Sequence, residues 1–150
     1  MKILIQECLR GKVTVDSNVV GQIQNGEVIF VGFTTGDNEE IIDKMLEKLF
    51  KLRIFKDENG KTNINLEQTG GNILCISQFT LYADLTQGNR PSFVDALKGE
   101  ESEKLYEYTK TKLKERLPDV QFGIFGADMK VELVNDGPFT IFMDSKELIK

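Results

Sequence analysis

Short apolar runs alternate with turn residues in the first third of the chain. The runs cover residues 3–9, 12–15, 19–23 and 27–33. Asn25-Gly26 separates the last two runs, and Asn-Gly is the strongest short hairpin signal because both residues tolerate positive φ. The pattern therefore predicts antiparallel strands.

The spacing of apolar residues then changes to a helical period. One apolar face is made of Ile41, Ile42, Met45, Leu46 and Leu49. Asp37 is predicted to be the N-cap residue of this helix, with Glu40 three positions later completing a capping box. The helix is expected to end near Lys51 or Leu52.

Two more helices and two more strands are predicted in the second half of the chain. A short helix is expected after Pro91, and a longer one over residues 102–116, stopped by a proline that disfavours helical backbone in the residue before it. Residues 129–133 and 139–143 are predicted to be strands. No linker or repeat interrupts the pattern, so residues 1–150 are predicted to form one α+β domain, an antiparallel sheet with helices packed against it.

The composition narrows the chemistry that this domain can perform. The chain has no histidine, so the commonest general base and the commonest metal ligand are missing. Cys8 and Cys75 both lie in apolar runs, and we interpret them as buried hydrophobic residues rather than as a disulfide, a nucleophile or zinc ligands. We expect no metal and no other cofactor. A hydrolase built on this chain must work by positioning its substrate and by fixed dipoles.

The charge and hydropathy of the chain limit its partners. A net charge of −5 argues against a long electrostatic contact with nucleic acid, so no DNA binding is expected, although a site that holds only one terminal nucleotide escapes this objection. No apolar run has transmembrane length, and the first residues lack a signal-peptide cleavage site. The chain is therefore predicted to be cytoplasmic, with no membrane partner.

Two short polar segments each continue an apolar run. Ser77-Gln78-Phe79-Thr80 ends a run over residues 72–79 that is apolar on both faces, as in a central strand. Asn135-Asp136-Gly137-Pro138-Phe139-Thr140 follows the predicted strand over residues 129–133. Both segments place backbone donors, hydroxyls and amides where a strand ends, which suits the binding of a small polar group in a dry cleft. One such segment alone would usually only satisfy backbone groups.

With Gly126-Ala127-Asp128-Met129 and Leu52-Arg53-Ile54-Phe55 also present, the chain resembles the D-aminoacyl-tRNA deacylases, the D-tyrosyl-tRNA deacylase family. The resemblance spans nearly the whole length, from Ile3-Leu4-Ile5-Gln6 to Thr140. It implies antiparallel β-sheets in a barrel-like arrangement. It also implies hydrolysis of the ester bond of D-aminoacyl-tRNA, which releases the free D-amino acid and tRNA as chiral proofreading in translation. Whether glycyl-tRNA is a second substrate stays open.

The resemblance implies a homodimer that binds the 3′ end of aminoacyl-tRNA at the subunit interface. Ser77, Gln78, Phe79 and Thr80 are the predicted catalytic segment, in which the N–H groups of Phe79 and Thr80 would stabilise an oxyanion. We interpret Thr80 as a positioning residue, because its hydroxyl is a weak nucleophile without a partnered base. The 2′-hydroxyl of the terminal ribose is an alternative source of activation for the attacking water.

Asn135, Gly137, Pro138 and Thr140 are the predicted chiral wedge, a rigid backbone segment that occupies the space an L side chain would need. The sequence alone favours a trans Gly137-Pro138 bond, whereas the resemblance implies a cis bond inserted into the partner's active site. One residue departs from the family. Glu7 stands where the family usually has arginine, which changes how the wedge is held.

Phe125 and Met129 are predicted to form an apolar slot for the terminal adenine, with core packing as an equal alternative. Two rival functions remain for the chain as a whole: a non-catalytic nucleic-acid or nucleotide-binding module on the same fold, and a hydrolase of other small esters.

Overall fold

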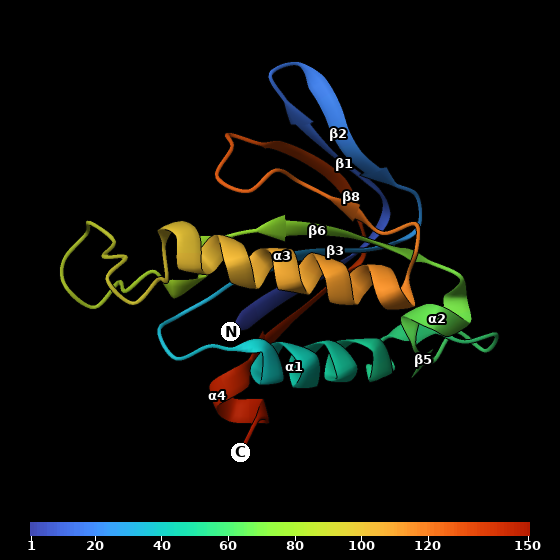
Figure 1. Cartoon of the computed structure of the whole chain (residues 1–150). Helices are drawn as coiled ribbons and strands as arrows, with labels where there is room; N and C mark the ends of the chain where they lie inside the picture. Colours follow the sequence, from blue (N-terminus) through green and yellow to red (C-terminus); the bar gives the residue numbers. More distant parts are fainter.

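The computed structural model describes all 150 residues and centres on one six-stranded sheet (Figure 1). The strands are β1 (Lys2–Val15), β2 (Asn18–Ile23), β3 (Gly26–Gly32), β6 (Asn72–Ser77), β7 (Gln121–Phe122) and β8 (Lys130–Asp144), while β4 (Phe55–Lys56) and β5 (Thr62–Ile64) form a separate hairpin. The helices are α1 (Glu39–Lys51), α2 (Leu66–Thr69), the 3-10 helix η1 (Phe79–Tyr82), α3 (Gly99–Arg116) and α4 (Ser145–Leu148). The predicted α+β class is confirmed.

The long strand β1 organises the sheet. One edge of β1 pairs first with β3 and then with β2, and the other edge pairs with β8 along nearly its whole length. Because β2 also contacts β6 and β7, the sheet curls into a nearly closed, barrel-like shape. This barrel-like arrangement is the one that the family resemblance implied.

The sheet is mixed rather than entirely antiparallel. β3 and β6 pair in parallel, as do β6 and β7. A parallel pair needs a crossover of a dozen or more residues, which is usually helical. α1 and α2 lie in the first of these crossovers and α3 in the second.

α1 and α3 run side by side over one face of the sheet (Figure 1) and cover the larger hydrophobic core. Ile3 and Ile5 of β1 point into this core, together with Met45 and Leu49 of α1. β6 lies between β3 and β7 and is buried along its centre, so its prediction as a central strand is confirmed. Both cysteines are buried and free, as predicted.

Several predicted boundaries need correction. The N-cap of α1 is Asn38, whose side chain accepts a hydrogen bond from the Ile41 N–H, and not Asp37. The Asp37 carboxylate instead accepts bonds from the Thr34 N–H and from the Met1 ammonium. α1 ends at Lys51 as predicted, and α3 ends at Arg116 but begins at Gly99, three residues before the predicted start.

The short helix predicted after Pro91 is wrong. This segment forms an irregular loop in which Asp84 and Ser92 exchange two backbone hydrogen bonds, and only a turn follows it. The two strands predicted within residues 3–15 are one continuous strand. Their break is absent because β8 pairs across it, from Arg10 to Lys12.

β8 is likewise continuous, with a loop that bulges from it at the Gly-Pro sequence. Cys8 of β1 pairs with Asn135, and Gln6 pairs with Thr140. Between these pairs β1 contributes one residue and β8 contributes four, residues 136–139, which must therefore project from the sheet. The Gly137-Pro138 peptide bond is cis, as the family resemblance implied. None of the helices is both long and apolar enough to cross a membrane.

Candidate active site

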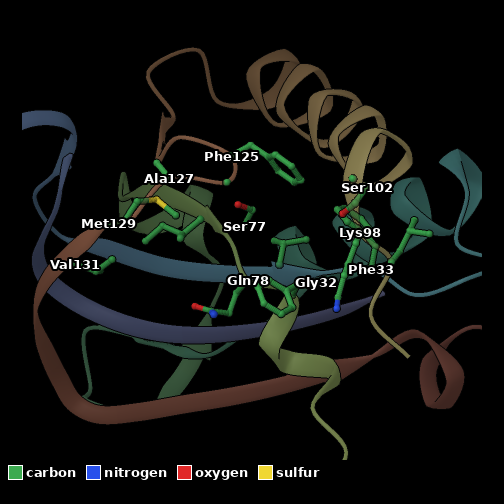
Figure 2. A pocket seen from close by; sticks show the side chains of 16 residues that line it. Gly32, Phe33, Ser77, Gln78, Lys98, Ser102, Phe125, Ala127, Met129 and Val131 are labelled. Atoms are coloured by element: carbon green, nitrogen blue, oxygen red, sulfur yellow. The ribbon is translucent and has the colours of Figure 1, made fainter. Parts of the chain in front are cut away.

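A cavity of about 470 Å³ opens where the central strand β6 ends (Figure 2). Four parts of the chain line it: the end of β3, the end of β6 with the start of η1, the loop between β7 and β8 with the start of β8, and the start of α3. Five of the predicted site residues are brought together here: Ser77, Gln78, Phe79, Phe125 and Met129.

The backbone at the end of β6 leaves two donors free. The Gln78 N–H still belongs to the sheet, because it donates to the Val31 carbonyl at 2.7 Å. The chain then turns into η1, and the first N–H groups of a helix have no partner within it. Neither the Phe79 N–H nor the Thr80 N–H makes a hydrogen bond within the chain. The two donors predicted from the sequence are therefore available to a ligand.

Gly32 allows the cavity wall to form. A Cβ atom on Gly32 would lie 2.7 Å from the Gln78 carbonyl oxygen, which is a backbone atom and cannot move aside cheaply. The missing side chain lets β3 approach the turn at Gln78, and this contact fixes where the free donors lie.

Thr80 is held by a polar contact of its own. The Gln78 side-chain amide donates a hydrogen bond to the Thr80 hydroxyl. No carboxylate or other proton acceptor bonds to this hydroxyl, and the Thr80 side chain is exposed and does not line the cavity. The contact orients Thr80 and supplies no base for a nucleophilic attack.

Phe125 and Met129 line the cavity from the segment between β7 and β8. Both side chains are half-buried, so each contributes to the core as well as to the cavity. Phe125 packs against Tyr106 with ring centroids 5.7 Å apart. A Cβ atom on Gly123 would meet the Met129 sulfur at 2.5 Å, so the glycine makes room for that side chain. The slot and the core-packing interpretation are thus both compatible with the structure.

The predicted wedge residues lie elsewhere in the chain. Asn135, Gly137, Pro138 and Thr140 are all exposed, and none of them lines the cavity at the end of β6. Gly137 instead lines a second pocket of about 200 Å³. Within one chain, the two polar segments therefore do not form a common site.

The second pocket contains the residue that departs from the family. Glu7 is 8% exposed and lines the pocket with Asp136 and Lys56, and it pairs across the strands with Glu27, which is 1% exposed. Each of the two glutamates has one carboxyl oxygen without a hydrogen-bond partner.

Burial raises the pKa of both glutamates. The pKa of Glu7 rises to about 7, chiefly through burial and further through Asp136, while Lys56 acts in the opposite direction. Burial, and then the neighbouring Glu7, raise the pKa of Glu27 to about 8. At least one carboxyl of the pair is protonated near neutral pH. Nowhere in the structure do three or more acidic or cysteine side chains gather as a metal site would require.

Sequence reasoning missed the wall of the cavity that the start of α3 forms. Lys98, Gly99 and Ser102 line it from the start of α3. The sequence predicts a helix that begins only at Ser102, so the first turn of α3 and the lysine before it lie outside the predicted helix. A glycine preceding a periodic segment was the only available signal.

The fold and the cavity define an α+β protein with free backbone donors beside a cleft at the end of a central strand, an arrangement suited to a small polar group. The chain belongs to the D-Tyr-tRNA(Tyr) deacylase family, whose model matches residues 4–144.

Relatives of known name are similar over nearly the full length. A D-aminoacyl-tRNA deacylase of Lactobacillus delbrueckii subsp. bulgaricus is 50% identical over 144 residues, which cover 96% of this chain and 99% of the relative. A D-aminoacyl-tRNA deacylase of Listeria innocua is 45% identical over 150 residues, the full length of both chains.

Two solved structures share the fold. The c-Myc DNA Unwinding Element Binding Protein superposes with a TM-score of 0.91 at 33% identity, covering 96% of this chain and 98% of that one. A probable eukaryotic D-amino acid tRNA deacylase gives a TM-score of 0.85 at 15% identity, covering 95% and 97%, and supports the fold alone.

Proposed function

We propose that this protein hydrolyses the ester bond of D-aminoacyl-tRNA and releases the free D-amino acid and tRNA, as chiral proofreading in translation. The observation that carries the proposal is the pair of unpartnered N–H groups of Phe79 and Thr80 beside the cavity. The names of the relatives, which are D-aminoacyl-tRNA deacylases, supply the substrate.

An aminoacyl-tRNA is an ester and is already activated compared with an amide. Stabilising the oxyanion and placing a water molecule can therefore suffice for its hydrolysis. A single preorganised donor at an oxyanion is worth about 10²–10³ in rate. The N–H groups of Phe79 and Thr80 supply two such donors without any histidine in the chain.

Thr80 positions the cleft in this mechanism and does not attack the substrate. Its hydroxyl is engaged by the Gln78 amide and has no base to remove its proton. The substrate's own 2′-hydroxyl, which is both a donor and an acceptor, orients the attacking water. The adenine of the terminal nucleotide occupies the slot between Phe125 and Met129.

The active site is proposed to be completed by a second copy of the chain. Phe30, Leu4 and Phe142 form a row across three neighbouring strands, and Phe142 is 51% exposed. An apolar row of this kind is typical of a surface that a partner covers. The wedge projects from β8 and is exposed. A segment that completes the active site of a neighbouring subunit must be exposed in this way.

The wedge rejects L substrates by backbone sterics, because no side-chain pocket can accept every D-amino acid and refuse every L one. Glu7 cannot donate hydrogen bonds to the wedge carbonyls when it is ionised. Lys56 lines the same pocket as Gly137 and is the basic residue there that can hold the loop.

Mixed dimers test the shared site. Thr80→Pro removes one free N–H group, and Gly137→Ala places a Cβ atom 3.0 Å from the Phe139 nitrogen at a backbone φ of +129°. Each variant alone should lose most of its activity. Co-expressed, the two should regain activity, because one of the two interface sites in a mixed dimer is intact. A site confined to one chain would give no recovery.

A nucleic-acid-binding module is the rival interpretation, and the printed name of one structural neighbour favours it. The net charge of −5 opposes it, because affinity for a duplex comes mainly from neutralising phosphates. A hydrolase of other small esters is the third candidate. A cytoplasmic location stays a prediction.

One experiment separates these functions. Purified protein is incubated with D-aminoacyl-tRNA, with a small D-amino acid ester, and with D-aminoacyl-tRNA plus a chelator, and free amino acid is measured over time. We expect multiple turnovers of the tRNA substrate with or without the chelator. Binding of tRNA without release would support the module, and equal turnover of the small ester would support the general esterase.

A further inference from the structure

The start of α3 forms one end of the cavity, and the proposed mechanism gives this end no role. In Figure 2, Lys98 and Ser102 lie at the opposite end of the cavity from Met129. Gly99, which follows Lys98 in the sequence, also lines the cavity. Three kinds of unsatisfied donor meet here: backbone N–H groups, a hydroxyl and an ammonium group.

The backbone donors come from the first turn of an 18-residue helix. The N–H groups of Gly99, Glu100 and Glu101 make no hydrogen bond within the chain, and the side chain of Lys98, the N-cap residue, does not cap the helix. Such a helix end carries a partial positive charge and binds anions well.

Ser102 provides an independent indication of a ligand. The residue is only 5% exposed and its side chain lines the cavity, yet its hydroxyl makes no hydrogen bond within the chain. Thr109 and Thr111 of the same helix bond back to the carbonyl four residues earlier, so the free hydroxyl of Ser102 is an exception. The polar side chain of a residue this buried is normally satisfied, and an acceptor in the cavity would satisfy this hydroxyl.

Lys98 adds a full positive charge to these donors. Its ammonium group lies 5.7 Å from the centre of the Phe79 ring and 5.9 Å from that of Phe93, and it forms no ion pair. The two rings hold the cation at the cavity rim next to the catalytic segment. Glu100 does not line the cavity; its side chain is 84% exposed and pairs with Lys104 at 3.6 Å, so it opposes an anion only weakly.

We propose that Lys98, the first-turn N–H groups of α3 and the Ser102 hydroxyl bind the phosphate on the 5′ side of the terminal ribose of the RNA substrate. This inference rests on the proposed function. One ribose carries the adenine, the ester and this phosphate. With the adenine at Met129 and the ester at Phe79, the remaining end of the cavity faces the phosphate.

Three substrates that differ only in their phosphates test the proposal. They are D-aminoacyl-tRNA, the 3′-D-aminoacyl ester of adenosine, and the same ester carrying a 5′-phosphate. The variants are Lys98→Gln and Ser102→Ala. Lys104→Gln serves as the control, because it removes a lysine from the same helix that does not line the cavity.

Both variants should raise KM by about tenfold for the two substrates with a phosphate, with kcat unchanged, and should leave the phosphate-free ester and the control unaffected. Lys98→Gln should also reduce the slope of log(kcat/KM) against log[salt] by about 0.7 for the tRNA. Equal effects on all three substrates, or an effect on the tRNA alone, would overturn the assignment of this phosphate. Wild-type protein that hydrolyses none of the substrates would instead overturn the proposed function.

Discussion

Replacing Glu27 by glutamine should make the protein's stability less dependent on pH. The Glu27 carboxyl is almost fully buried, has an oxygen without a partner, and faces Glu7 across the strands. Its pKa of about 8 in the folded chain compares with an ordinary value of 4.5. Glu27→Gln keeps the size of the side chain and removes the titration.

The expected magnitude follows from proton linkage. Between pH 4.5 and 8 the folded chain holds a proton that the unfolded chain releases, so the free energy of unfolding falls as pH rises. The stabilisation that comes from the proton on Glu27 is fully present below pH 4.5 and is lost as pH approaches 8. From pH 4.5 to 7 the loss is roughly 3 kcal/mol, at about 1.4 kcal/mol per pH unit.

Urea denaturation followed by circular dichroism measures this difference at several pH values from 4.5 to 7. The protein concentration must be constant, because the stability of an oligomer depends on it. The stability of Glu27→Gln relative to wild type should increase by roughly 3 kcal/mol across this range, whatever the offset at pH 4.5. The exposed Glu58→Gln variant is the control and should follow the wild type. Parallel curves for Glu27→Gln and wild type would show that Glu27 is ionised in the folded chain.

Two substitutions test the cleft directly. Thr80→Ala should retain deacylation within about tenfold of wild type, because only a positioning contact is lost; an acyl-enzyme trapped on Thr80 would refute this role. Gly32→Ala should lower kcat by about 10²-fold with an unchanged circular dichroism spectrum, because the added Cβ atom displaces Gln78 and the free donors after it. A wild-type rate for Gly32→Ala would mean that the position of this turn does not matter.

The sequence predicted those elements whose signals come from residues close together in the chain, such as α1. The periodic apolar face of α1 fixed its existence and its end at Lys51, although Asn38 rather than Asp37 caps it. Aspartate is a common N-cap residue, but the Asp37 carboxylate is bound to the Thr34 N–H and the Met1 ammonium. The second of these contacts joins residues distant in sequence, which no local pattern reveals.

The strand pairing could not be predicted from the apolar pattern. β6 is buried on both faces, and a buried strand has the same composition whether its neighbours are parallel or antiparallel. The helical segments before and after β6 were the only signal of its parallel partners. The predicted antiparallel arrangement holds for β1 with β2, β3 and β8, which are joined in part by short turns.

The candidate site was predictable where it follows a strand end. The Ser77-to-Thr80 segment carries its polar residues in the sequence, and the free N–H groups follow from the turn after Ser77. Lys98 and Ser102 were not predictable, because they belong to a helix start without a side-chain cap. The separation of Gly137 from this cavity within one chain is a tertiary fact that the motif alone could not show.

The proposed function is tested by the initial rates of deacylation of matched D- and L-aminoacyl-tRNA, measured on one tRNA with the purified wild-type protein. We predict rapid release of the D-amino acid, and release of the L-amino acid no faster than in the absence of protein. Equal rates for the two enantiomers, or no release of either, would contradict it.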